Sequence, residues 1–246
     1  MKVHVYKITC ITNLHVGNGD VNYSIIDNEV EKDPVLGEAL IPSSGIKGAL
    51  LSHAQENGMP SEQISEVFGN SENRGSYKFL SGNLLFRPIR VSEGEEAYIN
   101  ATSYELIEYY ESLLRDLGID ASTGISREKC NTVTNSAIVS AEGINADAKE
   151  ENKKLSELCG GKWFITSEKK LSAIDLPVAA RNKLSPTGES QNLWYEEYVP
   201  HHSVFFTVII TPGDDNKLDP FIDSKIVQFG ANATIGFGLT KMEKLY

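Results

Sequence analysis

Residues 41–50 read Ile-Pro-Ser-Ser-Gly-Ile-Lys-Gly-Ala-Leu, and the pattern changes here from irregular chain to helix. Ser43 or Ser44 can cap the start of a helix that we expect to run through residues 46–57. The unpaired amide groups of a helix start, a hydroxyl and Lys47 one turn further on form a candidate anion site. A capped helix with a solvated lysine explains the same residues equally well.

Upstream of this helix, we expect one strand followed by a long loop. Apolar and polar residues alternate through residues 3–13, which is typical of a half-buried strand. Residues 14–40 contain Gly17, Gly19 and Gly37 together with many charges and little apolar periodicity. Long structured loops are uncommon in compact domains and are often functional, so site residues are expected in this one.

Downstream, the sequence predicts a short helix, a strand and a longer helix. The short helix covers residues 61–68 and ends at Gly69, and the strand covers residues 80–91. In residues 103–117 leucine, isoleucine and tyrosine recur at helical spacing until Gly118, which is typical of an amphipathic helix.

The middle of the chain, residues 119–171, is interpreted as an insertion. Within it we predict strands at residues 136–141 and 162–166 and a charged surface helix at residues 146–158. Residues 175–200 then contain the strong turn signal Ser-Pro-Thr-Gly-Glu-Ser between two extended runs. This arrangement predicts a protruding β-hairpin.

The last part of the chain repeats the arrangement of the first. A β-rich run at residues 203–211 precedes a predicted helix at residues 219–229, opened by Pro220, and a final strand at residues 234–245. Both ends of the chain therefore give strand–helix–strand. This is the β-α-β-β-α-β order of a ferredoxin-like (RRM-like) α+β fold, here interrupted by insertions.

Length and composition fit one elaborated domain. The chain has 246 residues, of which 40% are hydrophobic and 23% charged, so a substantial apolar core can form. We predict a single domain, residues 1–246, with its core at roughly 1–118 and 201–246. The insertion and the hairpin occupy roughly residues 119–200.

Charge and cysteine content bear on partners and compartment. The net charge of −11 argues against a nucleic-acid partner, although a locally basic groove can coexist with acidic loops. The three cysteines are far apart and fit neither a disulfide framework nor a metal knuckle, which favours a reducing compartment. The N-terminus lacks the apolar run of a signal peptide, and no stretch approaches the roughly 18 apolar residues of a membrane helix. A cytoplasmic location is therefore expected.

Four segments are more specific than these patterns. Besides residues 41–50, they are Leu-His-Val-Gly-Asn-Gly at 14–19, Asn-Leu-Trp-Tyr-Glu-Glu-Tyr-Val-Pro at 192–200, and Phe-Gly-Ala-Asn-Ala-Thr-Ile-Gly-Phe-Gly at 229–238. In this order they resemble the RAMP superfamily of CRISPR proteins over nearly the whole chain. The segment at 192–200 resembles the backbone subunit of the type III-B (Cmr) effector complex. The resemblance implies a RAMP core whose hairpin acts as a thumb between guide and target strands.

The resemblance also implies an activity. Backbone subunits of this kind bind guide RNA (crRNA) and cleave the complementary target RNA endonucleolytically in antiviral defence. They cut with a loop aspartate, which Asp27 matches, and His15 is predicted to orient RNA or assist proton transfer. One carboxylate can act as a base or hold a hydrated Mg²⁺, so Asp27 is also the predicted metal ligand. A solvated acid and a hydrogen-bonded loop histidine are the plain alternatives, and Glu29, Glu31 and Asp33 are expected to be solvated.

Several residues are predicted to bind RNA. The helix start is expected to face the guide backbone, arginines can pair with phosphates bidentately, and the glycine-rich segment near the C-terminus resembles the signature loop of the superfamily. The predicted RNA-binding residues are Ser43, Ser44, Lys47, Arg90, Arg181, Asn232 and Thr234. Some relatives have an acidic residue where this chain has Ala233, so no catalytic role is carried over to that position.

Two other functions fit parts of the pattern. One is a non-catalytic RNA-binding scaffold in the same kind of complex, with Asp27 as surface decoration. The other is a guide-processing endoribonuclease, but such enzymes usually depend on a general-base histidine and act alone, and the thumb-like hairpin argues against this. The partners that the resemblance implies are guide RNA, target RNA, further copies of the chain lined up along one guide, and the other subunits of the effector complex.

Overall fold

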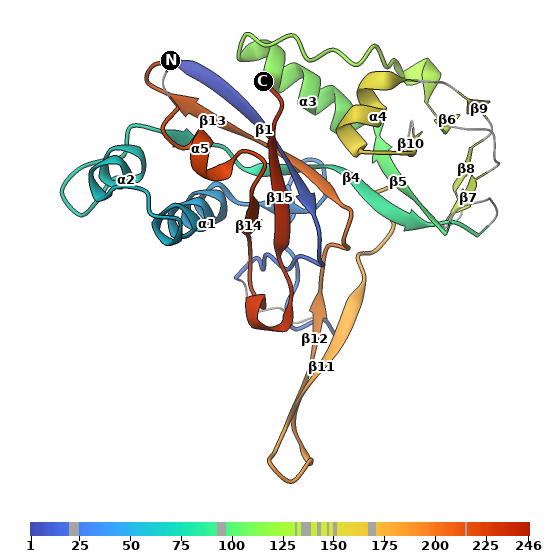
Figure 1. Cartoon of the computed structure of the whole chain (residues 1–246). Coiled ribbons are helices and arrows are strands. Elements are labelled where there is room, and N and C mark those ends of the chain that lie inside the picture. The colour runs from blue at the N-terminus through green and yellow to red at the C-terminus, as the bar shows by residue number, and fades with distance from the viewer. Residues whose placement is uncertain are drawn as a thin grey trace.

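A twisted mixed sheet forms the middle of the molecule, and a long hairpin projects from one side of it (Figure 1). The computed structural model describes residues 1–19, 25–92, 97–130, 132–133, 139–141, 144–146, 148–149, 152–166, 171–214 and 216–246. In the described part of the chain, no helix is both long enough and apolar enough to cross a membrane.

Four strands make the centre of the sheet. They are β1 (Lys2–Cys10), β4 (Gly82–Arg90), β13 (Val204–Thr211) and β15 (Leu239–Lys244). They lie in the order β15-β1-β13-β4, and all three pairings are antiparallel. Counted along the chain this is the order 4-1-3-2, which is the order of a ferredoxin-like sheet. The predicted fold class is confirmed.

The sheet extends beyond this centre on both sides. On one side β14 (Ile226–Gln228) pairs with β15. On the other side follow β5 (Tyr98–Ser103), β10 (Trp163–Thr166), β6 (Thr132–Val133) and β9 (Ala148–Lys149). The short strands β2 (Leu40–Ile41) and β3 (Lys78–Phe79) pair with β4 and β13, respectively. A separate antiparallel two-stranded sheet consists of β7 (Val139–Ala141) and β8 (Ile144–Ala146).

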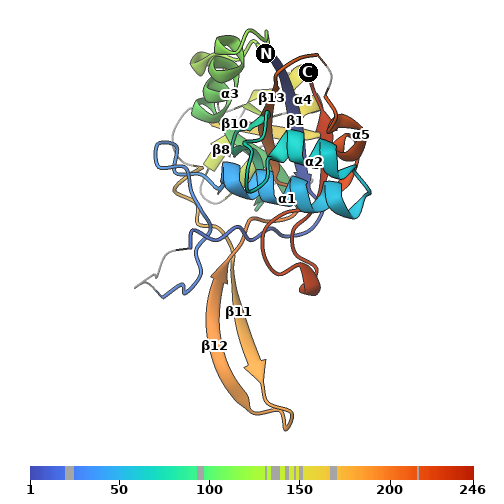
Figure 2. The same cartoon turned by 90° about the vertical axis from the view of Figure 1, so that its left-hand side faces the viewer.

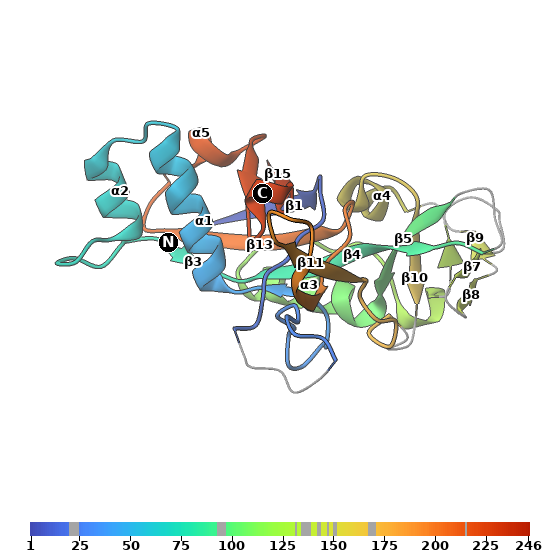
Figure 3. The same ribbon diagram turned by 90° about the horizontal axis from the view of Figure 1, so that it is seen from below.

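Helices cover both faces of the sheet. One cluster of apolar side chains contains residues of α1 (Ser43–Glu56), α2 (Ser61–Phe68) and α5 (Asp219–Ile222). A second contains residues of α3 (Tyr104–Asp116) and α4 (Lys153–Cys159). Adjacent side chains of a strand point to opposite faces, and accordingly Phe205 belongs to the first cluster and Phe206 to the second. Viewed from below, α1 and α2 lie at one end of the molecule and β7, β8 and β9 at the other (Figure 3).

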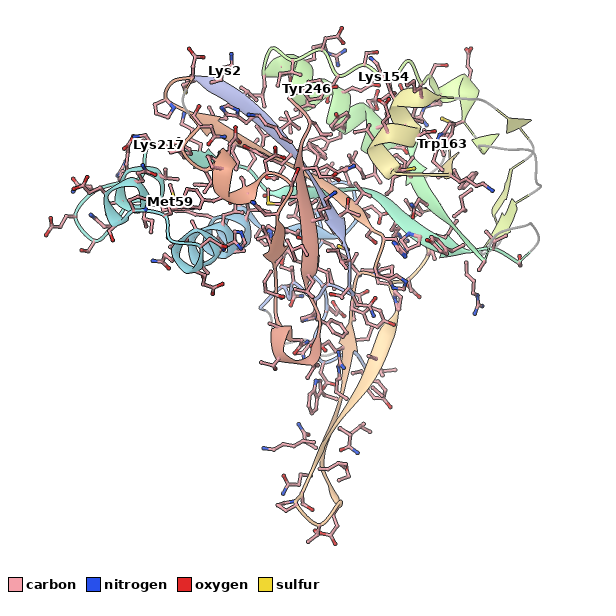
Figure 4. All side chains as sticks on the ribbon, in the orientation of Figure 1. Lys2, Met59, Lys154, Trp163, Lys217 and Tyr246 are labelled. Carbon is pink, nitrogen blue, oxygen red and sulfur yellow. The ribbon has the colours of Figure 1, made fainter. Side chains whose placement is uncertain are left out.

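Buried side chains join the inserted elements to the core. Trp163 of β10 is fully buried next to α4, and its Nε1 donates to Ser156 Oγ at 3.1 Å (Figure 4).

All three cysteines are free and buried, and burial raises the pKa of Cys10 to about 12.

The hairpin consists of β11 (Val178–Leu184) and β12 (Ser190–Glu197), and it extends well away from the sheet (Figure 2). Its turn closes through a hydrogen bond from Gly188 N to Ser185 O at 2.9 Å, with Gly188 at a φ of 88°. The predicted protruding hairpin is therefore confirmed, whereas the proposed division into core and insertion stays a prediction.

The prediction of serine capping at α1 is wrong. The helix begins at Ser43 itself, and Pro42, with φ −55° and ψ 150°, occupies the N-cap position without a side-chain cap. The two serines lie one and two residues past that position, inside the first turn. A serine cap does occur at α3, where Ser103 Oγ accepts from Leu106 N at 3.3 Å.

Two predicted helices are too long. The helix expected at residues 219–229 ends at Ile222, because the chain becomes extended at Asp223 and residues 226–228 pair with β15. The helix expected at residues 146–158 begins at Lys153, where Asn152 Oδ1 accepts from Leu155 N at 3.1 Å. In both cases strand pairing overrides local helix propensity.

Other strand boundaries also shift. The final strand begins at Leu239 and not at Thr234, because Ala233–Ile235 form a 3₁₀ turn, and the first strand ends at Cys10. The strand expected at residues 162–166 is confirmed as β10. Part of the strand expected at 136–141 is present as β7, and residues 136–138 lie outside the described residues.

Candidate functional site

Three segments that are distant in the sequence meet at the base of the hairpin. Leu14 N donates to Val199 O, and Val199 N to Leu14 O, both at 2.8 Å. Asn28 N donates to Tyr195 O at 3.1 Å, and Ala231 N donates to His15 O at 2.9 Å. The N-terminal loop, the end of β12 and the glycine-rich C-terminal segment are thus held together by backbone hydrogen bonds.

Glu196 is the centre of this junction. Its side chain is buried, and its Oε1 accepts from Asn232 Nδ2 at 2.8 Å while its Oε2 accepts from Arg181 Nε at 3.0 Å. His15 Nε2 lies 3.7 Å from Oε1. The guanidinium of Arg181 also stacks over the Phe237 ring at 4.6 Å. One carboxylate therefore fixes Arg181 of the hairpin and Asn232 of the glycine-rich segment, with His15 next to it.

His15 has a defined tautomer in its neutral form. Its Nδ1 lies 2.6 Å from the carbonyl oxygen of Glu197, which can only accept, so Nδ1 carries the proton. In the neutral ring the lone pair on Nε2 then faces the Glu196 carboxylate. Only 5% of His15 is exposed, so it is placed to position its surroundings and not to contact a large ligand directly.

Glycines allow the chain to pass close to His15. A Cβ atom on Gly230 would lie 2.2 Å from His15 O, and Gly230 has a φ of 71°, which other residues rarely adopt. A Cβ atom on Gly17 would lie 3.1 Å from His15 Nε2. Gly17 and Gly230, one from each motif, are thus explained by close packing around this histidine.

Asp27 is exposed and lies along β12, the strand that His15 also contacts. Its Oδ2 accepts from Tyr195 N at 2.8 Å, and its own backbone N donates to Tyr195 O at 3.1 Å. His15 contacts Glu197, two residues further along β12, which corresponds to about 7 Å along a strand. The two predicted catalytic residues are therefore brought to the same edge, with one carboxylate fixed at the surface and the imidazole buried behind it.

Glu197 anchors the loop that carries Asp27. Its Oε2 accepts from Val30 N at 3.0 Å and its Oε1 accepts from Lys32 Nζ at 2.9 Å. Adjacent side chains of a strand point to opposite faces, so Glu196 and Glu197 stabilise different segments. Glu197 thus fixes the loop a few residues beyond the exposed aspartate.

No three His, Cys, Asp or Glu side chains among the described residues are arranged to hold a metal ion. A hydrated Mg²⁺ requires less, because it keeps several waters and binds through one or two carboxylates. The exposed Asp27 carboxylate, with one oxygen engaged by Tyr195 N, fits that mode of binding.

The other predicted RNA-binding residues divide into two groups. Arg181 and Asn232 lie at the junction, where their hydrogen bonds go to Glu196. Exposed side chains elsewhere belong to Ser43, Ser44, Lys47, Arg90 and Thr234. The first three lie at the start of α1, and further along this helix a hollow of about 390 Å³ separates it from the glycine-rich segment, with Gly48, Ser52 and Gly230 in its lining.

Arg87 and Arg90 lie in different environments although only two residues separate them. Arg87 is 3% exposed, its Nη2 donates to the carbonyl oxygens of Leu171 and Ile174, and its Nε lies 3.5 Å from Glu38. Arg90, at the end of β4, is exposed. Of the two, only Arg90 presents its charge to solvent.

Sequence reasoning missed Glu196 and Glu197 as site residues. Both lie in the segment at 192–200 that carries the resemblance, but their burial depends on two loops that cross β12 from elsewhere in the chain. The signal available in the sequence was the alternation of side chains along a strand, which places the neighbouring Glu196 and Glu197 on opposite faces of β12.

Comparison with known proteins agrees with this architecture. The family model of the RAMP superfamily matches residues 7–241. The chain belongs to the RAMP superfamily. It is 24% identical to the CRISPR system Cmr endoribonuclease Cmr4 of Pyrococcus furiosus, over 98% of this chain and 95% of that protein.

Solved structures of RAMP proteins share the fold. A chain of the type III-B Cmr-beta complex bound to cognate target RNA has a TM-score of 0.81 at 21% identity, covering 99% of this chain and 97% of that chain. Oligomeric Cmr4 from Pyrococcus furiosus has a TM-score of 0.73 at 18% identity, covering 99% of each chain.

Proposed function

We propose that this chain is a repeated backbone subunit of a type III-B CRISPR effector complex, which binds guide RNA and cleaves the complementary target RNA. The observation that carries the proposal is the exposed Asp27 carboxylate, fixed by Tyr195 N at 2.8 Å on a junction that Glu196 and Glu197 stabilise. Membership of the RAMP superfamily and similarity to a protein named as an endoribonuclease support it.

The assembly follows from the same comparisons. One similar structure contains cognate target RNA and another is oligomeric, which supports further copies of the chain, guide RNA, target RNA and the other complex subunits as partners. In such an assembly the guide provides sequence specificity by base pairing, while the protein contacts backbone and shape. We place this assembly in the cytoplasm.

The chemistry is an attack of the RNA on itself. The 2′-oxygen adjacent to the cut forms a bond to phosphorus as the bond to the 5′-oxygen breaks, which leaves a 2′,3′-cyclic phosphate and a 5′-hydroxyl. Asp27 accepts the proton from the 2′-hydroxyl, directly or through water, and the departing 5′-oxygen takes up a proton from solvent. General base assistance of this kind typically contributes about 10²- to 10⁴-fold in rate.

The buried residues hold this geometry. His15, fixed by its hydrogen bond to the Glu197 carbonyl, sets the course of the loop that leads to Asp27. Lys47 with Ser43 and Ser44 at the start of α1, and Arg90, bind the guide backbone. A Mg²⁺ ion at Asp27, when bound, supplies charge relief at phosphorus.

The first experiment reconstitutes the complex with guide RNA and a labelled complementary RNA. Asp27→Ala is expected to lower the cleavage rate at least about 10²-fold while target affinity is retained. Glu31→Gln, a neighbouring acid in the same loop, serves as the matched control and is expected to cleave normally. Chelation of Mg²⁺ by EDTA is expected to abolish cleavage by the wild type, with restoration on adding Mg²⁺ back.

The outcomes separate the candidate functions. Binding without cleavage in the wild type would support a non-catalytic scaffold. Regular cleavage that persists in Asp27→Ala would assign the chemistry to another residue or subunit. Cleavage that is unchanged by EDTA would remove the metal from the proposal while leaving Asp27 in place.

A further inference from the structure

Exposed aromatic rings lie stacked beside the base of the hairpin. The rings of Tyr98 and His202 are parallel to within 6°, with centroids 5.4 Å apart. His201 contacts the His202 ring with a centroid distance of 4.6 Å and an angle of 61°. Tyr98 is 43% exposed, and both histidines are exposed as well. The three rings come from segments about a hundred residues apart and meet at the surface.

The backbone at His202 is in an unfavourable conformation. Its φ of 69° lies in the left-handed region, which glycine and asparagine adopt far more readily than histidine. The turn is held by hydrogen bonds from His202 N to Cys10 O at 2.8 Å and from Ser203 N to Pro200 O at 3.3 Å. Because the ring is exposed, burial does not compensate for this strain. Strained residues of this kind point to a functional use of the side chain.

Charge around the rings favours an anionic, planar ligand. Arg90 is directly opposite Tyr98 in the β4–β5 ladder, so the two side chains lie on the same face. Partial desolvation and the neighbouring His201 lower the pKa of the exposed His202 ring below its usual value of 6.5. Two parallel rings therefore lie next to an exposed cation.

The rings are connected to the candidate site. His201 N donates to Asn13 Oδ1 at 3.0 Å, and Asn13 lies two residues before His15. A ligand bound on the rings would therefore sit beside the start of the loop that leads to Asp27.

We propose that Tyr98 and His202 form a stacking platform for an unpaired nucleobase of RNA, with Arg90 binding an adjacent phosphate. This inference rests on the proposed function and adds a contact to it. Single-stranded nucleic acids are commonly held by aromatic side chains that stack on bases together with cations along the backbone.

The test measures binding of a labelled single-stranded RNA to the full chain by fluorescence anisotropy over a series of salt concentrations. Tyr98→Leu is expected to weaken binding about 5- to 100-fold without changing the salt slope, because a stacking contact releases no counterions. Arg90→Gln is expected to reduce the salt slope by about one phosphate contact. Tyr98→Trp is expected to retain affinity, and its added fluorescence relative to wild type is expected to be quenched by RNA.

His202→Gly separates the platform from a structural role. Glycine relieves the left-handed backbone strain, so urea unfolding is expected to show equal or greater stability, whereas RNA affinity falls. Wild-type affinity in both Tyr98→Leu and His202→Gly would overturn the platform. Target binding without cleavage by the wild-type complex would instead overturn the proposed cleavage function, so the two failures are distinguishable.

Discussion

At the scale of single residues, the buried Glu196 carboxylate determines whether the junction holds. Glu196→Gln keeps the shape but removes the charge that pairs with Arg181 Nε at 3.0 Å. Arg181 Nη2 is buried without a hydrogen-bond partner, so the guanidinium already depends on this carboxylate. Breaking a buried pair typically costs about 3–5 kcal/mol, and partial exposure of Arg181 places this case near the lower end.

The prediction for Glu196→Gln is a loss of about 3 kcal/mol in the free energy of unfolding, measured by urea titration, together with slower target cleavage. Glu197→Gln is the comparison variant, because it also removes a buried carboxylate of β12. The contact between His15 and the backbone carbonyl of residue 197 is retained in that variant. Equal stability and cleavage in wild type and Glu196→Gln would show that the junction does not depend on this charge.

The residue scale also shows what the sequence could provide. Asp27 and His15 could be proposed because of the resemblance to the RAMP superfamily, and the structure places both next to β12. Their roles stay predictions until the cleavage experiments are made. Glu196 could not be singled out, because an acid on a projecting hairpin is ordinarily solvated, and only the crossing of two distant loops buries it.

At the scale of elements, prediction succeeded where the local pattern was strong. Residues 61–68 form α2 as expected, and α3 differs from its predicted bounds by one residue at each end. It failed at residues 223–229, where a helical pattern continues but pairing with β15 imposes a strand. Long-range pairing of this kind is invisible in a single sequence.

The hairpin formed by β11 and β12 is the element whose role a single substitution tests most directly. Leu193 and Leu184 are 54% and 57% exposed, and a two-stranded hairpin in water gains nothing from exposing apolar side chains. We expect Leu193→Ser to leave the free energy of unfolding within about 0.5 kcal/mol of wild type, as is usual for surface changes. The hairpin is expected to act as a thumb between guide and target strands, and we propose the exposed Leu193 as its apolar wedge. Target affinity in the assembled complex is therefore expected to fall several-fold in Leu193→Ser.

The measurement pairs urea unfolding of the isolated chain with target binding by the reconstituted complex. Lys183→Ser, the neighbouring exposed position of the facing strand, provides a control for charge as distinct from apolar contact. Unchanged target affinity in Leu193→Ser would remove the wedge role from this residue.

At the scale of the whole molecule, stability is expected to depend on pH through buried histidine. Burial, reinforced by Lys244, lowers the pKa of His4 below its usual 6.5. His4 is 5% exposed, and its Nε2 lies 3.2 Å from Thr211 Oγ1 across the central β1–β13 pair. Below pH 6.5 the unfolded chain binds a proton that the folded chain resists, so folding loses stability as the pH falls.

Other groups act on stability over the same range, and a difference measurement cancels them. Burial raises the pKa of Glu38 above 4.5, so this carboxyl favours the folded state as pH falls, and the net charge of −11 becomes smaller on acidification. Both contributions are shared by wild type and His4→Gln, in which glutamine can still hydrogen-bond Thr211 but cannot be protonated. The free energy of unfolding of the wild type, relative to the variant, is therefore expected to decline from pH 7 to pH 5. A difference that stays constant over this interval would show that His4 does not couple proton binding to folding.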